Sequence, residues 1–198
     1  MILKYNYWQF NSILPKEICE NIIKFAKQKK QKKGKVGGDE SKPNLAQRDS
    51  NVPSLNEQWI YKTVLPYLQM ANQNAGWNFQ LDKAESAQFT IYKKGQYYKW
   101  HFDARDEPYK KHKDKTLNGK IRKLSMTVSL NDPKEYSGGD FEFRVFDLKG
   151  KGVIHKCKEI RPQGSIVVFP SFMHHRVTPV TRGERNSLVI WVVGNPYV

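Results

Sequence analysis

A histidine and an aspartate two residues apart form the first pair that could do chemistry together. They occur in Trp100-His101-Phe102-Asp103, within a segment whose composition favours a β-strand. Because alternate side chains of a strand point to the same face, His101 and Asp103 would lie side by side. An imidazole and a carboxylate on one face can fill two adjacent positions around a metal ion. The alternative is a hydrogen-bonded pair at the surface, since so short a motif often arises by chance.

A second histidine segment follows about 70 residues later, in Phe-Pro-Ser-Phe-Met-His-His-Arg-Val-Thr-Pro over residues 169–179. Two histidines and one carboxylate with open coordination positions form the facial triad of non-haem Fe(II) oxygenases. Adjacent residues of a strand face opposite ways, so His174 and His175 cannot both be ligands. The spacing to Pro179 and Arg185 favours His175.

An arginine ten residues after His175 could bind a carboxylate. The Arg-Gly-Glu stretch before it predicts a turn, which would bring the following strand beside the histidine strand. The two-residue period of that strand places four residues on one face: Arg185, Ser187, Val189 and Trp191. A guanidinium can hold a carboxylate by two parallel hydrogen bonds, and Ser187 would add a donor. The alternative is an arginine at the rim, paired with Glu184 or Asp140.

Short β-type segments, separated by Gly, Pro, Asn and Asp, dominate the sequence from residue 85 onward. Many short strands without intervening helices indicate a sandwich or a barrel, and eight of them indicate a jelly roll. The expected strands cover residues 86–93, 97–103, 122–130, 139–146, 153–160, 164–169, 173–178 and 186–194.

The first 84 residues carry helical patterns instead. A helix is expected over residues 15–29, because proline suits the first helical position and an apolar stripe follows it. Residues 31–53 are expected to form a loop, since their glycines and prolines follow no period. Ser54 and Glu57 match a capping box, so a second helix is expected to begin there and to be kinked or divided at Pro66.

The chain is strongly basic. Its 198 residues include 34 Lys and Arg against 19 Asp and Glu, a formal charge of +15, and the excess is concentrated over 24–35 and 105–123. Such runs could bind the phosphates of a nucleic acid, attract an acidic or phosphate-bearing partner, or only keep the surface solvated. Residues 104–121 form a long charged break between strands, which is interpreted as either a lid over substrate or a disordered tether.

Several classes of protein are excluded or disfavoured. No apolar run reaches the roughly 18 residues that a membrane span needs. The N-terminus lacks the features of a signal peptide, and two cysteines are too few for a disulfide scaffold. We therefore expect a cytoplasmic, globular protein with one domain over residues 1–198, and the sequence does not indicate its oligomeric state.

Several ordered segments together resemble the prolyl 4-hydroxylase-like Fe(II)/2-oxoglutarate dioxygenases, especially their single-domain bacterial and viral members. Gln-Phe-Thr-Ile-Tyr-Lys-Lys-Gly-Gln-Tyr-Tyr-Lys-Trp-His-Phe-Asp over 88–103 is similar to the family's first metal segment. Residues 124–132 and 136–143 resemble its middle strands, and 169–191 its second metal segment and co-substrate clamp. The resemblance covers about residues 46–198.

This resemblance implies a role for each of nine positions. The Fe(II) ligands would be His101, Asp103 and His175. The distal carboxylate of 2-oxoglutarate would be bound by Tyr92 and Arg185, with Ser187 as a weaker candidate. The residues facing the prime substrate would be Tyr98, Arg122 and Trp191. The family often has lysine at the position of Arg185, and arginine keeps the charge there.

The resemblance also implies a fold and a reaction. The fold would be a double-stranded β-helix (a jelly-roll or cupin-like barrel) over 85–198, supported by helices in 1–84. The reaction would be hydroxylation of a prolyl residue in a protein or peptide. It would consume O2, convert 2-oxoglutarate to succinate and CO2, and use ascorbate as reductant.

Two other functions stay open at this stage. One is the same chemistry on a nucleic acid or another non-prolyl substrate, and the other is a non-catalytic binding module on the same barrel. Residues 186–198 contain no arginine, whereas the family's nucleic-acid demethylases carry a two-arginine tail pattern.

Overall fold

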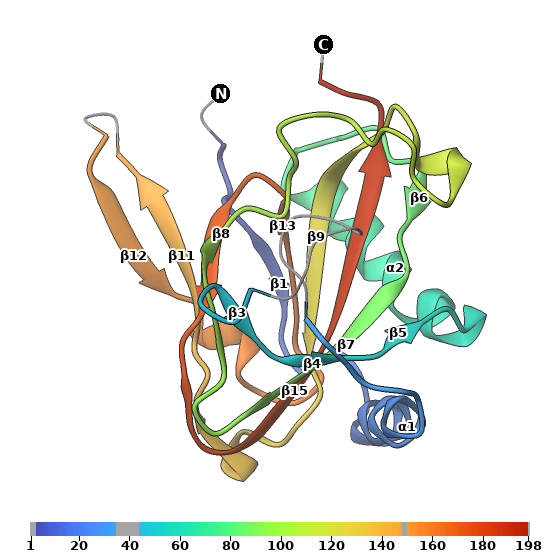
Figure 1. Cartoon of the computed structure of the whole chain (residues 1–198). Helices are drawn as coiled ribbons and strands as arrows, with labels where there is room; N and C mark the ends of the chain where they lie inside the picture. The colour runs from blue at the N-terminus through green and yellow to red at the C-terminus, as the bar shows by residue number, and fades with distance from the viewer. Residues whose placement is uncertain (1–2, 35–43, 148–149, 198) are drawn as a thin grey trace.

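Two antiparallel β-sheets form the framework of the computed structural model, which describes residues 3–34, 44–147 and 150–197 (Figure 1). The larger sheet has the strand order β1 (Trp8–Phe10), β13 (Ile166–Pro170), β9 (Ile121–Ser129), β15 (Val180–Gly194), β7 (Ala87–Lys93), β4 (Asn51–Val52) and β2 (Lys32–Lys33). Three short strands add to it: β10 (Tyr136–Gly138) and β6 (Lys83–Ala84) on β15, and β5 (Ser54–Leu55) on β7. The smaller sheet has the order β12 (Gly152–Lys156), β11 (Phe141–Phe146), β14 (His174–Val177), β8 (Tyr97–His101) and β3 (Arg48–Asp49).

The two sheets face each other, and the alternation of side chains divides the apolar residues between two cores. In β13, Ile166 and Val168 belong to the core on the outer side of the larger sheet. Val167 and Phe169 belong to the core between the sheets. There Phe169 meets Phe143 of the smaller sheet, with ring centroids 5.1 Å apart. The core between the sheets therefore combines aromatic side chains with aliphatic ones.

Two helices cover the outer face of the larger sheet. They are α1 (Lys16–Lys27) and α2 (Gln58–Asn74), and each buries an apolar stripe. These stripes form one core with Leu188 and Ile190 of β15. Three short 3-10 helices lie in the connections, at Lys115–Leu117, Pro133–Glu135 and Lys158–Ile160. The helices thus support the long strand whose opposite face carries Arg185, Ser187 and Trp191.

Removing one apolar side chain from this outer core should destabilise the fold. Leu188 is fully buried, so Leu188→Ala is expected to lower the free energy of unfolding by about 2–5 kcal/mol, measured by urea denaturation. Met70→Ala is the control, because Met70 is 45% exposed on α2. A similar small change in both variants would show that Leu188 does not contribute to a shared core.

The predicted mainly β architecture with flanking helices is confirmed. Each expected strand is present, with ends that differ by a few residues. The largest differences are β15, which begins six residues before the expected strand over 186–194, and β12, which ends at Lys156 where a 3-10 helix follows. The first helix also lies where it was expected, with Pro15 as its N-cap.

The predicted start of the second helix is wrong. Ser54 and Leu55 form β5 and pair with β7, whereas the helix begins at Gln58 with Glu57 as its N-cap. Leu55 is fully buried in this position, so burial against the sheet outweighs the local capping pattern. The helix also continues through Pro66 and is not divided there.

Two expectations about irregular segments need correction. The predicted loop over 31–53 contains β2, β3 and β4, while residues 35–43 lie outside the described part of the chain. The interpretation of 104–121 as a disordered tether is also wrong. Tyr109 and Leu117 from this segment pack against Val193 in a small buried cluster, and the Tyr109 amide donates to the Lys120 carbonyl at 2.9 Å.

The described helices include none with both the length and the apolar character needed to cross a membrane. Cys19 and Cys157 are buried and form no disulfide. Burial raises the pKa of the Cys19 thiol to about 11 and that of Cys157 to about 12. Both side chains therefore stay protonated near neutral pH and act as small apolar residues.

Candidate metal centre and carboxylate pocket

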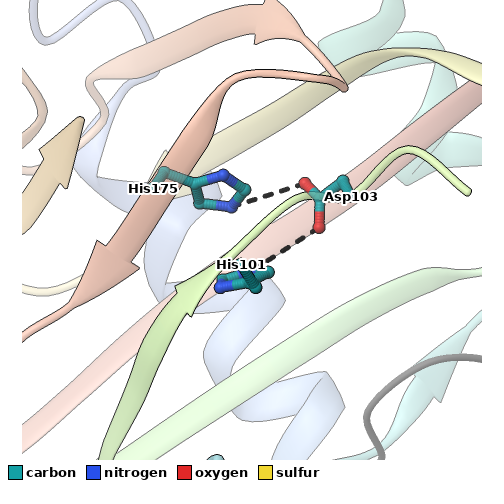
Figure 2. Close-up of side chains that lie close together, drawn as sticks. All are labelled: His101, Asp103 and His175. Atoms are coloured by element: carbon teal, nitrogen blue, oxygen red, sulfur yellow. Dashed lines mark ion pairs between the residues drawn. The ribbon is translucent and has the colours of Figure 1, made fainter. Parts of the chain in front are cut away.

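Three side chains from the smaller sheet converge between the two sheets. His101 ends β8 and lies directly opposite His175 of β14 in the antiparallel register, and Asp103 follows two residues after His101. The His101 Nε2 atom is 3.7 Å from Asp103 Oδ1, and His175 Nε2 is 3.5 Å from Asp103 Oδ2 (Figure 2). One ligand atom from each residue lies within 4.8 Å of the others. The pair expected from sequence is therefore a buried cluster of three, and not a surface hydrogen bond.

Backbone hydrogen bonds fix Asp103 beyond the end of its strand. The amides of Asp103 and Ala104 both donate to the Ser171 carbonyl, at 2.9 and 2.7 Å. Ser171 precedes β14, so the contact ties the two candidate ligand segments together. Its side chain also shares a hydrogen bond of 3.0 Å with Ser125 of β9. The position of the carboxylate thus depends on three segments that are distant in sequence.

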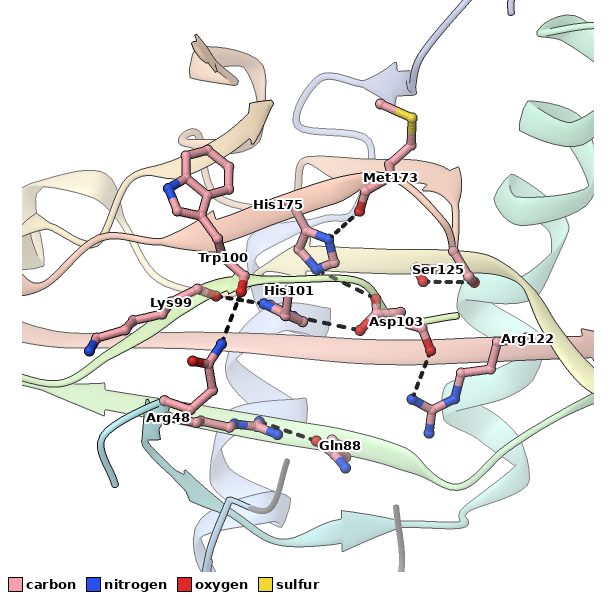
Figure 3. A network of polar contacts seen from close by, with 12 residues as sticks. Arg48, Gln88, Lys99, Trp100, His101, Asp103, Arg122, Ser125, Met173 and His175 are labelled. Atoms are coloured by element: carbon pink, nitrogen blue, oxygen red, sulfur yellow. Dashed lines mark hydrogen bonds and ion pairs between the residues drawn. The ribbon is translucent and has the colours of Figure 1, made fainter. Parts of the chain in front are cut away.

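Both imidazoles are oriented by the backbone. His101 Nδ1 is 2.7 Å from the Lys99 carbonyl, and His175 Nδ1 is 2.8 Å from the Met173 carbonyl (Figure 3). A carbonyl oxygen can only accept, so each Nδ1 carries the proton and each Nε2 presents its lone pair to Asp103. Such a bond on the far nitrogen fixes the tautomer and the ring orientation of a histidine that binds metal.

Burial and neighbouring charges set the protonation states of the cluster. Burial and the nearby His175 hold the pKa of His101 well below its usual value, so this imidazole is neutral. Burial alone would raise the pKa of Asp103, but His175, His101 and Arg122 outweigh it and lower that pKa. Two imidazoles, each held through Nδ1 by a backbone carbonyl, and one carboxylate form a donor set that suits Fe(II) and leaves coordination positions open.

His174 lies on the other face of β14, as adjacent residues of a strand must. Its ring stacks on Phe102 with centroids 4.5 Å apart and lies 5.2 Å from the Trp100 ring. It is therefore directed away from Asp103, and the structure brings His175 into the cluster.

A buried arginine lies in the same pocket as the cluster. Arg185 of β15 is 3% exposed, and its Nη1 donates to Ser187 Oγ at 3.2 Å. The two carboxylates expected as alternative partners are paired elsewhere: Asp140 with Lys156 and Arg161, and Glu184 with Lys27. Within the described segments, no carboxylate lies within 4.0 Å of the Arg185 guanidinium. A buried charge without a counter-ion is costly, so the pocket is suited to a ligand carboxylate.

The strand β7, which is paired with β15 in the same sheet, places polar groups beside Arg185. Arg185 pairs with Tyr92 and Ser187 with Thr90 in the antiparallel register. The Tyr92 ring lies 5.8 Å from the guanidinium carbon, and burial raises the pKa of its hydroxyl, which therefore stays a donor. Thr90 Oγ1 is buried and has no hydrogen-bond partner among the residues that the structure describes. These groups could hold a carboxylate beside Arg185.

Two of the three residues expected to face substrate, Tyr98 and Trp191, line this pocket, and the third, Arg122, does not. Tyr98 stacks on His101 with ring centroids 3.4 Å apart. Trp191 is 6% exposed, and its indole nitrogen has no hydrogen-bond partner within the described segments. Both also line a wider cleft outside the pocket. Arg122 lies 3.9 Å from the Trp191 ring and donates twice to Glu85, at 2.7 Å each. Its charge is therefore already compensated within the protein.

The pocket residues that sequence reasoning missed include Thr90 and Arg48. Thr90 lies two positions before Tyr92 on the same strand face, so the two-residue period could have identified it. Arg48 gave no local signal, because β3 is only two residues long. Its guanidinium lies 4.7 Å from the Tyr98 ring and donates to Ser50. It also donates to Gln88, as Figure 3 shows. Only the folded chain brings this arginine to the pocket.

Comparison with known sequences supports this geometry. The family model described as the 2OG-Fe(II) oxygenase superfamily matches residues 87–193, which is more than half of the chain. A PKHD-type hydroxylase from Xylella fastidiosa strain M12 is 36% identical over 104 residues. These residues are 52% of this chain and 42% of that relative, so the match spans less than half of the relative's length.

Comparison with solved structures supports the fold. A Pseudomonas putida prolyl-4-hydroxylase aligns with a TM-score of 0.71 and 22% identity, over 96% of this chain and 93% of that one. A Trichoplax adhaerens prolyl hydroxylase, solved with a hypoxia-inducible factor peptide fragment, aligns with a TM-score of 0.67 and 13% identity, over 96% and 84%. The predicted double-stranded β-helix is confirmed. Because the family model matches the β-helix core, the chain belongs to the 2OG-Fe(II) oxygenase superfamily.

Proposed function

We propose that this protein is an Fe(II)- and 2-oxoglutarate-dependent dioxygenase that hydroxylates a prolyl residue in a protein or peptide. The reaction would use O2 and convert 2-oxoglutarate to succinate and CO2, with ascorbate keeping the iron reduced. One observation carries the proposal. A cluster of two imidazoles and a carboxylate shares a pocket with the buried Arg185, which has no protein carboxylate as partner among the described residues.

Different residues of the pocket would bind the metal and the co-substrate. His101, Asp103 and His175 would hold Fe(II), which when bound supplies the activation of O2 and the binding of the 2-oxo acid. Arg185 would hold the distal carboxylate of 2-oxoglutarate, and a bidentate contact would orient the whole molecule.

The remaining donors would complete the co-substrate site. Ser187 and Tyr92 would add hydrogen bonds to the carboxylate, and the orphaned Thr90 hydroxyl would gain a partner. Phe141 and Phe169 line the same pocket and would exclude water from the reacting atoms.

Two features support a prolyl residue in a peptide as the substrate. The solved structures with the same fold include prolyl hydroxylases, one of them with a peptide bound. Tyr98 and Trp191 present aromatic rings at the opening of the pocket, which suit the apolar ring of proline.

The test of this function is a coupled assay. The purified protein is loaded with Fe(II) without oxygen, then supplied with O2, 2-oxoglutarate and ascorbate, with and without proline-containing peptides. We expect succinate release that increases with a suitable peptide, and a peptide product heavier by one oxygen atom at proline. Absence of succinate under every condition would refute the dioxygenase assignment. Succinate release with oxygen found only on another residue type would refute the prolyl assignment.

A glycine beside Arg185 offers a further test of the proposed carboxylate site. Gly139 has φ +61°, and a Cβ there would lie 2.9 Å from Arg185 Cδ and 3.0 Å from Val180 Cγ2. Gly139→Ala is expected to displace the guanidinium and to raise the KM for 2-oxoglutarate by about tenfold or more, which corresponds to ~1.4 kcal/mol.

Gly150→Ala is the matched control for this change. Gly150 has a similar φ of +76°, but a Cβ there would meet nothing within 4 Å. Both alanines should cost stability through the left-handed backbone, at roughly 1–2 kcal/mol each. Only the Gly139 variant should alter the KM for 2-oxoglutarate. An equal change in both variants would mean that lost stability, rather than a displaced Arg185, is the cause.

A further inference from the structure

The pocket opens into a larger cleft, which is not needed to bind the metal or 2-oxoglutarate. The cleft has a volume of about 540 Å³ and shares five lining residues with the pocket: Arg48, Gln88, Tyr98, Asp103 and Trp191. A substrate that reaches the metal cluster from this side must therefore pass through the cleft. It is also far larger than a prolyl side chain needs, so it can hold several neighbouring residues of a peptide.

The lining of this cleft is strongly cationic. Its positively charged residues are Lys32, Lys33, Arg48, Arg105, Lys113 and Arg122. The acidic residues that line it within the described part of the chain are Asp103, which belongs to the candidate metal cluster, and Asp106. Among the described residues of the lining, six positive charges thus face two carboxylates, one of which would be bound to the metal.

Only some of these charges are compensated by the protein. Arg122 is held by Glu85, and Lys33 forms an ion pair of 2.8 Å with Asp49. By contrast, Lys32, Arg105 and Lys113 are exposed, and no carboxylate of the described segments lies within 4.0 Å of their charged nitrogens. They come from β2 and from the segment 104–121, which are far apart in sequence, so the fold gathers their charges at one cleft.

We infer that the cleft binds an acidic peptide, with Asp or Glu side chains close to the residue that is hydroxylated. This inference rests on the proposed function and names the substrate class of that same site. The separate carboxylates of an acidic peptide can each form an ion pair with one of three cations: Lys32, Arg105 or Lys113. A nucleic acid is favoured less, because its continuous row of phosphates would also run past the carboxylate of Asp106, which lines the cleft.

The test compares two peptides and two triple variants. One peptide carries Asp and Glu around a central proline, and the other carries Asn and Gln at the same positions. The cleft variant is Lys32→Gln, Arg105→Gln and Lys113→Gln. The control variant is Lys62→Gln, Lys134→Gln and Lys151→Gln, which removes the same number of charges from exposed positions that do not line the cleft.

Binding is measured by fluorescence anisotropy on iron-free protein at several NaCl concentrations. Wild-type protein is expected to bind the acidic peptide about tenfold or more tightly than the amide peptide, with the difference shrinking as salt rises. Each exposed ion pair changes affinity by roughly two- to fivefold, so the cleft variant should lose most of this preference. The control variant should keep it. In the succinate assay, the cleft variant should raise the KM for the acidic peptide more than it lowers kcat.

Several results would overturn the inference. Equal binding of the two peptides by wild-type protein, or an equal loss in both triple variants, would show that the cleft does not select acidic side chains. Tighter binding of a single-stranded oligonucleotide, together with succinate release stimulated by it, would assign the cleft to nucleic acid instead. Because binding is measured without iron, a failure of the proposed dioxygenase activity leaves the charge preference separately measurable.

Discussion

Replacing His175 with alanine is expected to lower succinate formation by at least about 100-fold and to remove tightly bound iron. Loss of a residue that only orients a metal ligand already costs about 10- to 100-fold, and His175 would supply a ligand atom itself. Its Nε2 faces Asp103 at 3.5 Å, while its other ring nitrogen is held by the Met173 carbonyl. The measurements are succinate release and the iron content of anaerobically loaded protein after desalting. The same loss is expected for His101→Ala.

His174→Ala is the matched control for this prediction. It removes the same side chain from the neighbouring position, on the strand face that stacks on Phe102. This variant should keep its iron and most of its activity. Loss of iron in the His174 variant alone would reverse the assignment of the second histidine. Normal iron content in both variants would refute a metal site at this cluster.

Replacing Arg185 with alanine is expected to raise the KM for 2-oxoglutarate by about 30-fold or more. Removing one partner of a buried charge pair costs about 2–5 kcal/mol, and every 1.4 kcal/mol is tenfold in affinity. Iron content should not change, because Arg185 is not among the three residues of the metal cluster. Arg185 would contact the carboxylate of 2-oxoglutarate equally in the bound complex and in the transition state. Its loss should therefore change KM more than kcat.

Two variants separate this role from a general effect of charge. Arg185→Lys keeps the positive charge and should retain much of the affinity for 2-oxoglutarate. Arg182→Ala removes an exposed arginine of the same strand, which donates to the Lys134 carbonyl, and should leave the KM for 2-oxoglutarate unchanged. An unchanged KM in Arg185→Ala would place the co-substrate carboxylate elsewhere.

Local periodicity predicted much of the site. The two-residue period of a strand places His101 with Asp103, and Arg185 with Ser187, Val189 and Trp191. All of these residues line the pocket between the sheets. The same rule separated His175 from His174. These predictions hold because the direction of a side chain in a strand depends on backbone geometry alone.

Local patterns failed where long-range packing decided the structure. The capping box at Ser54 predicted a helix start, but pairing with β7 and burial of Leu55 made this segment a strand. The short strands β2, β3 and β4 carry no pattern of their own. They exist because β8 provides an edge for β3, β7 provides one for β4, and β4 in turn provides one for β2. Isolated pairs of two residues would not be stable without such a template.

The sequence by itself determined the chemistry of the site: which residue types are present, which of them share a strand face, and the family that they resemble. The tertiary structure decided which charges meet. It left Arg185 buried while Asp140 and Glu184 bind other cations, and it brought Arg48, Lys32, Arg105 and Lys113 to one cleft. The physical reason is the separation along the chain of the residues that decide each property. Side-chain direction follows from neighbouring residues, whereas the loss or gain of a counter-ion depends on strand pairing between distant segments.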